Sequence, residues 1–228
     1  WVMADGEIKG KYTAAEAKTF PAEQRQTLSL RTLDLAEITV SEKEPLPKTA
    51  PTALAVSDVR YTYGRKAGDT LSGVSFSVRE HEIVGLVGAN GCGKTTIGKL
   101  IAGLYRPSGG KISLFGKAQP PKQLQKRVLF ILQEAEFQFF TNSVLHELQY
   151  GHAVTPEFEA KTEVLLKNMD MWNCRDRHPF SLSGGQMQKL TLMMAYLSDK
   201  PIIVLDEPTA GQDAECLARC AALIREMR

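Results

Sequence analysis

A glycine-rich run contains residue types that can bind a phosphate group. It reads Gly88-Ala89-Asn90-Gly91-Cys92-Gly93-Lys94-Thr95-Thr96. The glycines let backbone N–H groups converge on phosphate oxygens at the N-terminus of a helix, where the helix dipole already favours anions. Lys94 would then reach the β- and γ-phosphates, and the Thr95 hydroxyl would ligate Mg²⁺. A chance glycine-rich turn is the alternative. A strand pattern before the run and a helix pattern after it favour phosphate binding.

Two adjacent carboxylates, Asp206 and Glu207, follow the apolar run Ile202–Leu205. Such a run is typical of a strand covered on both faces, as the parallel strands of α/β proteins are. Carboxylates after this strand would lie at the C-terminal edge of a sheet, where open α/β sheets bind ligands. We expect Asp206 to hold Mg²⁺ and Glu207 to orient or deprotonate an attacking water. The pair alone would suit a solvated loop, so this prediction depends on the phosphate loop at the same sheet.

A second glycine turn, Leu182-Ser183-Gly184-Gly185-Gln186, also stands at the start of a predicted helix. Apolar residues at helical spacing follow it, so the turn would again present N–H groups to an anion. One domain needs only one cradle for a γ-phosphate. The second turn is therefore expected to serve nucleotide held by another domain.

The elements that must position these residues alternate between strand and helix patterns. We predict strands over Ala53–Tyr63, Leu71–Val78 and Ile83–Val87, the last of which leads into the glycine-rich run. A helix is predicted from Lys94, because apolar residues recur there at helical spacing. Strands alternating with helices, together with the buried-strand pattern near the carboxylates, place the chain in the α/β fold class.

In this order, the phosphate loop, the Leu182–Gln186 turn and the Asp-Glu strand resemble the Walker A, signature and Walker B motifs of ABC ATPases. The resemblance covers roughly Leu54 to Arg228. It implies a P-loop NTPase (RecA-like) core with an antiparallel β-subdomain and an inserted α-helical subdomain. It also implies an ATPase that uses ATP and Mg²⁺, in which the signature of one domain closes over ATP on a second nucleotide-binding domain.

The family's further positions carry over residue by residue. Gln133 resembles the glutamine that senses Mg²⁺ and the γ-phosphate, although an ordinary surface glutamine is the alternative. Tyr63, just before Gly64, resembles the aromatic residue that stacks on adenine, and, with Tyr61 nearby, a packed strand tyrosine is the alternative. Asp213, at the end of the run from Thr209, matches the D-loop aspartate. The predicted catalytic residues are Glu207, Lys94 and Gln133, and the predicted Mg²⁺ ligands are Thr95, Gln133 and Asp206. Nucleotide contacts are predicted for Tyr63, Gly88, Asn90, Gly91, Cys92, Gly93, Lys94, Thr95, Thr96, Ser183, Gly184, Gly185, Gln186 and Asp213.

The chain departs from the family pattern in two places. Cys92 occupies a loop position where Ser or Ala is commoner, and a small side chain still fits there. The family's switch histidine lies on the strand after the D-loop, and Arg228 is reached before it. We therefore expect a nucleotide-binding domain over residues 54–228 that is truncated before this histidine.

The region from Gln133 to Gly151 is similar to energy-coupling-factor ATPases, which supply vitamins or cobalt and nickel. In that group this region receives a helix of the integral membrane subunit. Phe137, Phe139 and Phe140 would then be exposed anchors for docking, and burial in the local core is the alternative.

Ahead of this domain, the run Val2–Ile8 predicts an Asp-Gly hairpin, and the Thr13-to-Glu16 spacing predicts a capping box that starts a short helix. We interpret residues 1–20 as the C-terminal remnant of a preceding ABC domain, and the proline-punctuated stretch 21–53 as an interdomain linker.

Composition separates the candidate functions. Lys and Arg total 28 against 26 for Asp and Glu, which gives no support to nucleic-acid binding. Four cysteines without a CxxC pair favour a reducing compartment, and Cys216 with Cys220 should be buried on one helix face. No metal site beyond Mg²⁺ is predicted, because the four histidines are far apart. We expect a cytoplasmic ATPase, peripheral on the inner face of the cell membrane, that powers uptake through membrane partners. A soluble ABC protein acting on ribosomes or DNA is the alternative, and a fragment that binds nucleotide but hardly turns it over is a third.

Overall fold

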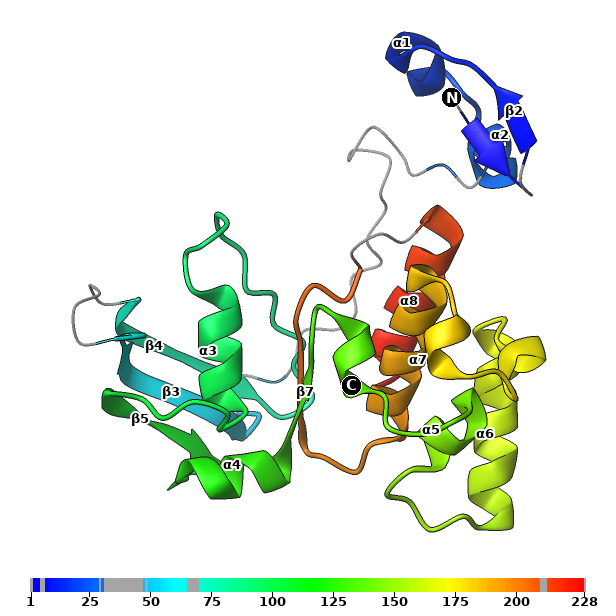
Figure 1. Cartoon of the computed structure of the whole chain (residues 1–228). Helices are drawn as coiled ribbons and strands as arrows, with labels where there is room; N and C mark the ends of the chain where they lie inside the picture. The colour runs from blue at the N-terminus through cyan, green and yellow to red at the C-terminus, as the bar shows by residue number, and fades with distance from the viewer. Residues whose placement is uncertain are drawn as a thin grey trace.

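The computed structural model describes residues 2–4, 7–28, 30, 47, 49–64, 70–209 and 213–227 (Figure 1). Three predictions therefore lie wholly or partly outside the described residues. They are the Asp5-Gly6 turn, most of the linker, and the D-loop between Thr209 and Asp213.

The N-terminal segment contains the predicted hairpin strands and the predicted short helix. Strand β1 (Val2–Ala4) pairs antiparallel with β2 (Glu7–Gly10), and α1 (Ala14–Lys18) follows. The capping box is confirmed, since the Thr13 hydroxyl accepts from the Glu16 amide at 3.2 Å and the Thr13 amide donates to the Glu16 carboxylate at 2.7 Å. A further helix, α2 (Ala22–Thr27), lies inside the stretch predicted as linker. Its Glu and Gln residues are good helix formers, which explains a local helix there.

A four-stranded antiparallel sheet forms the predicted β-subdomain, in the order β4-β3-β5-β6. Its strands are β3 (Thr52–Tyr61), β4 (Leu71–Arg79), β5 (Gly109–Leu114) and β6 (Lys117–Ala118). Helices α3 (Lys94–Ile101) and α4 (Pro121–Arg127) contribute to the same core (Figure 1). This first core is made of fully buried aliphatic residues, among them Val59, Ile97, Leu100, Leu114 and Leu124. The sheet and α3 therefore form one packed unit beneath the glycine-rich run.

A separate pair of parallel strands joins the middle of the chain to its C-terminal part. Strand β7 (Val128–Ile131) pairs with β8 (Ile202–Leu205) in register, so that Ile131 lies opposite Leu205. The predicted strand Ile202–Leu205 is confirmed. The expected cover on both faces of β8 is only partial, because all four of its residues are half-buried. Val204 packs against the first core and Leu205 against the second, since neighbouring residues of a strand point to opposite faces.

The predicted strand Ile83–Val87 is also wrong. This segment lies outside any strand or helix, and Val87 is 93% exposed while Ile83 is 54% exposed. A strand exists only where its N–H and C=O groups find a partner, and among the described residues no other strand bonds to this segment. The apolar run therefore has the composition of a strand without the pairing of one.

The helical subdomain is built around α7 (Gly184–Leu197), the helix that follows the second glycine turn. Around it lie α5 (Val144–Gln149), α6 (Pro156–Asn168), α8 (Ala214–Glu226) and three 3-10 turns, η2 (Ala135–Gln138), η3 (Trp172–Cys174) and η4 (Pro179–Ser181). They enclose a second core that includes Leu166, Met171, Leu190, Met193 and Cys220. Cys216 and Cys220 are buried on one face of α8 with their sulfurs 3.8 Å apart, as predicted.

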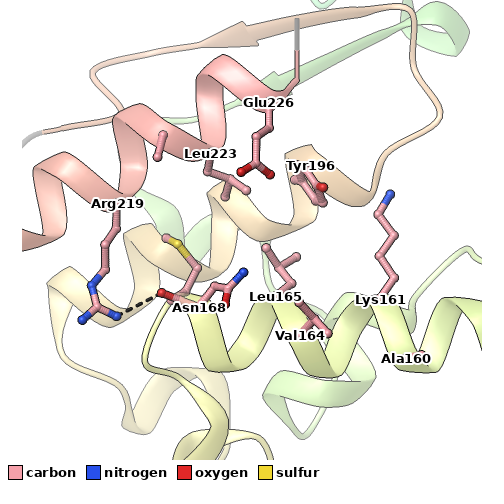
Figure 2. Close-up of a pocket in the computed structure, with 11 residues that line it drawn as sticks. Ala160, Lys161, Val164, Leu165, Asn168, Tyr196, Arg219, Leu223 and Glu226 are labelled. Atoms are coloured by element: carbon pink, nitrogen blue, oxygen red, sulfur yellow. Dashed lines mark hydrogen bonds between the residues drawn. The ribbon is translucent and has the colours of Figure 1, made fainter.

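A groove of about 440 Å³ lies between α6, α7 and α8 (Figure 2). Lys161 Nζ sits 4.7 Å from the ring centroid of Tyr196, and Arg219 donates to the Asn168 carbonyl at 3.0 Å. No predicted site residue within the described ranges lines this groove.

Within the described ranges, no helix is both long enough and apolar enough to span a membrane.

Candidate functional site

The glycine-rich run ends on a residue whose backbone only glycine adopts easily. Gly93 has φ of +100° and precedes the first residue of α3, while Gly91 has φ of +79°. A Cβ on Gly93 would lie 2.7 Å from Leu71 Cδ2, which belongs to the first core. The left-handed backbone therefore favours glycine at position 93, and a larger residue would also have to displace the Leu71 side chain.

Lys94 is held at the glycine-rich run itself. Its Nζ donates to the carbonyls of Gly88 and Ala89, each at 2.9 Å. The ammonium charge thus lies beside the turn that was predicted to bind phosphate. A cation on the first residue of a helix, next to unbonded N–H groups, concentrates positive charge at one point.

The two residues predicted to share Mg²⁺ are in direct contact. The Thr95 hydroxyl donates to Asp206 Oδ1 at 3.1 Å across 111 positions of sequence. The amide of Asp206 donates to the Ile131 carbonyl at 3.0 Å, which extends the β7–β8 pairing by one bond. A hydroxyl and a carboxylate are the hard oxygen donors that Mg²⁺ prefers, so this donor set fits that ion.

Gln133 and Glu207 meet at the same edge. The Gln133 amide Nε2 donates to Glu207 Oε2 at 3.0 Å. Each residue follows the end of one strand of the parallel pair, and the carboxyl ends of parallel strands lie at one edge of a sheet. Glu207 has φ of +49°, an uncommon backbone conformation for a non-glycine residue and one found often at functional sites.

Tyr63 lies beside the first turn of α3. Its hydroxyl shares a hydrogen bond of 2.9 Å with Thr96 Oγ1, and the residue is 56% exposed. Tyr63 lies beyond the end of β3, so it is not the packed strand tyrosine of the alternative reading. Tyr61 holds that position, and burial first, then its neighbours Tyr105 and Tyr63, raise the pKa of its phenol. Sequence reasoning missed Tyr105, because its contact with β3 exists only in the folded chain.

The second glycine turn carries a reciprocal cap at the start of α7. Ser183 caps α7 by accepting from the Gln186 amide at 3.3 Å, and the Gln186 side chain accepts from the Ser183 amide at 3.0 Å. Gly184 and Gly185 open the helix. Among the described residues, no hydrogen bond joins this turn to the first one. Asp213 caps α8 by accepting from the Cys216 amide at 2.7 Å.

The three phenylalanines divide between the two alternatives, exposed docking anchors and burial in the local core. Phe137 is 68% and Phe140 75% exposed, as expected of docking anchors, whereas Phe139 is 8% exposed and belongs to the second core. Sequence reasoning missed Glu147, which is 1% exposed. Its carboxylate accepts from the amides of Phe140 and Thr141 at 3.0 and 2.8 Å. No pattern in the sequence distinguishes it from a solvated helix residue.

These contacts bring the phosphate loop, Gln133 and both carboxylates to one edge, and the family comparison agrees with that arrangement. The model of the ABC transporter family matches residues 71–210, so the chain belongs to this family. The motifs predicted an ATPase with the P-loop NTPase fold. The family match and the solved structure described below support both predictions.

Three curated relatives show the kinds of protein to which the chain is similar. "Putative HMP/thiamine import ATP-binding protein YkoD" of Bacillus subtilis is 36% identical over 82% of this chain and 36% of its own length. "Energy-coupling factor transporter ATP-binding protein EcfA1" of Staphylococcus epidermidis is 32% identical over 75% of this chain and 66% of its own length. "Nod factor export ATP-binding protein I" of Rhizobium etli is 35% identical over 71% of this chain and 52% of its own length.

A solved structure agrees in fold. The protein cbiO1 of Clostridium perfringens, described as part of the ABC transporter complex cbiONQ, has a TM-score of 0.66 and 25% identity. The match covers 78% of this chain and 74% of that one. The chain spans 36%, 35% and 44% of the length of the first three curated relatives, so it corresponds to less than half of each.

Proposed function

We propose that the chain binds MgATP between the phosphate loop and the carboxylates and hydrolyses it to drive transport. The hydrogen bond of 3.1 Å between Thr95 and Asp206 carries this proposal. It joins the two groups that the sequence assigns to one metal ion, across a sequence separation that chance rarely bridges.

Each residue has a defined part in the reaction. Lys94 neutralises charge on the β- and γ-phosphates, while Thr95 and Asp206 hold the ion together with Gln133. Mg²⁺, when bound, supplies positive charge to the phosphate oxygens. Glu207 orients the attacking water or accepts its proton, because a carboxylate at the sheet edge can face the γ-phosphate. Tyr63 stacks on the adenine.

The second glycine turn serves a partner domain. Ser183 and the amides after it form a helix N-terminus that, among the described residues, is not bonded to the chain's own phosphate loop. Such an N-terminus attracts anions. We infer that it closes over ATP held by a second nucleotide-binding domain, and that Asp213 acts at that same interface.

An integral membrane subunit is the proposed second partner. The exposed rings of Phe137 and Phe140 offer apolar anchors, and Phe140 stacks on Tyr150 at 6.0 Å between centroids. Buried Glu147 fixes the backbone that carries Phe140 through bonds to two successive amides. The relatives named for HMP/thiamine import and for an energy-coupling factor transporter support a role in uptake. We propose a vitamin or metal ion as the cargo and the inner face of the cell membrane as the location. The relative named for export makes the direction of transport part of this proposal.

A double-mutant cycle tests the metal site in the full-length protein. Thr95→Ala and Asp206→Asn should each weaken Mg²⁺-dependent ATP binding, and the double variant should lose little more than either one, because both act through one ion. The measurement is titration with a fluorescent ATP analogue at varied Mg²⁺. Asp199→Asn, an exposed carboxylate before β8, is the matched control. Fully additive losses would contradict a shared ion.

A further inference from the structure

Three tyrosines meet beside α3 and form an aromatic cluster of Tyr61, Tyr63 and Tyr105. The rings of Tyr61 and Tyr105 are parallel within 1°, with centroids 5.3 Å apart. Tyr63 is nearly perpendicular to both, at 5.1 Å from Tyr61 and 5.8 Å from Tyr105. Edge-to-face and offset parallel pairs are the favoured arrangements of aromatic rings.

The parallel pair is built on rigid elements. Tyr61 is the last residue of β3 and pairs with Leu71 of β4. Tyr105 follows α3, and the preceding residue Leu104 donates its amide to the Lys99 carbonyl at 2.9 Å. Both rings pack on the first core. Lys99 Nζ lies 5.6 Å from the centroid of Tyr105, so a cation also faces that ring.

Tyr63, by contrast, has no strand to hold it. It lies beyond the end of β3, and 56% of it is exposed. Its ring is oriented by the two tyrosines on one side and by the hydroxyl bond to Thr96 on the other. Thr96 belongs to the first turn of α3, next to the residues proposed to bind phosphate and metal. Tyr63 thus reaches from the aromatic pair to the edge of the nucleotide site.

We propose that Tyr105 is a positioning residue for base recognition: its ring, stacked on Tyr61, holds Tyr63 in the orientation that receives a purine. This inference rests on the proposed binding of ATP and adds a residue that does not itself touch the nucleotide. Tyr105 contributes to affinity for the base and leaves affinity for the triphosphate unchanged.

The experiment separates base from phosphate in the full-length protein with Mg²⁺ present. Affinities for ATP and for inorganic tripolyphosphate are measured by calorimetry in the wild type, Tyr105→Leu and Tyr105→Phe. Losing the aromatic contacts should weaken ATP binding about two- to tenfold in Tyr105→Leu. Tripolyphosphate binding should not change, and Tyr105→Phe should retain wild-type affinity because it keeps the ring.

Each other outcome overturns a distinct claim. Equal losses for ATP and tripolyphosphate in Tyr105→Leu would reveal a general structural effect and overturn the inference, as would unchanged ATP affinity. A wild type that binds neither ligand would overturn the proposed function itself. Tyr105→Met replaces Tyr105→Leu if thermal unfolding shows that the leucine variant does not fold, with the same results expected.

Discussion

The two glycine turns of this chain both open a helix, yet they are connected to the molecule in different ways. The turn before α3 is tied to a distant segment, since Thr95 bonds to Asp206 across 111 positions, while Lys94 bonds back to the Gly88 carbonyl within the same run. The turn before α7 is held by the reciprocal contacts of Ser183 and Gln186, and the Gln186 side-chain amide also donates to the Cys174 sulfur at 3.6 Å, so its described bonds stay within the helical subdomain.

This difference teaches what a helix N-terminus needs to become a complete site within one chain. Both turns offer unbonded N–H groups to an anion. The first turn is bonded to a carboxylate, since the Thr95 hydroxyl donates to Asp206. Among the described residues no carboxylate bonds to the second turn, which is the arrangement expected of a surface completed by a partner.

The largest expected effect is on ATP turnover, and it follows from a substitution of Glu207 near the first turn. Glu207→Gln should lower ATP turnover on the order of 10²–10⁴-fold, because it removes the group that positions or deprotonates water. Affinity for MgATP should stay near wild type. Phosphate release and nucleotide titration measure the two quantities. Glu134→Gln, an exposed carboxylate close to Gln133, is the control. Wild-type turnover in Glu207→Gln would remove that residue from the mechanism.

Lys94→Ala is the next test, and it concerns binding. Loss of charge-assisted hydrogen bonds to phosphate should cost about 3 kcal/mol, or roughly 100-fold in ATP affinity. The loss should be the same with and without a partner domain, because Lys94 acts on nucleotide held by its own chain. Lys122→Ala on α4 controls for the change in net charge. Unaltered affinity in Lys94→Ala would mean that the first turn is not the phosphate site.

The smallest effect is expected at the second turn, where a substitution tests how this turn differs from the first one. Ser183→Ala removes a helix N-cap and should lower the free energy of unfolding by about 1 kcal/mol. ATP affinity of the separate chain should not change, whereas turnover of the assembled protein should fall by roughly tenfold, as one hydrogen bond to a charged phosphate is lost.

A matched variant isolates the functional part of that effect. Thr155→Ala removes the N-cap of α6, where the Thr155 hydroxyl accepts from the Phe158 amide at 3.2 Å. It should cost a similar free energy of unfolding, measured by urea denaturation, and leave turnover unchanged. If both variants lose turnover equally, the second turn has no role beyond capping its helix.

Local features of this protein were predictable from sequence alone. The capping boxes at Thr13 and Ser183 depend on residues one helical turn apart, and the structure contains both. Gly93 opens α3 in a left-handed conformation, as a turn between a loop and a helix requires. The sequence also assigned Thr95 and Asp206 to one metal ion, and the structure brings these two residues into contact.

The remaining features depend on which distant segments meet, and only the tertiary structure decided them. Ile83–Val87 has the apolar composition of a strand. Among the described residues no strand pairs with it, so it stays exposed. Phe139 enters the second core while Phe140 stays outside it, although both belong to one aromatic run. Glu147 and Tyr105 gain their partners from other elements. Sequence alone thus determined the contacts made within a helical turn and the order of the motifs. Pairing and burial were decided by the whole chain, because a backbone group or a ring is satisfied only by the neighbour that folding brings to it.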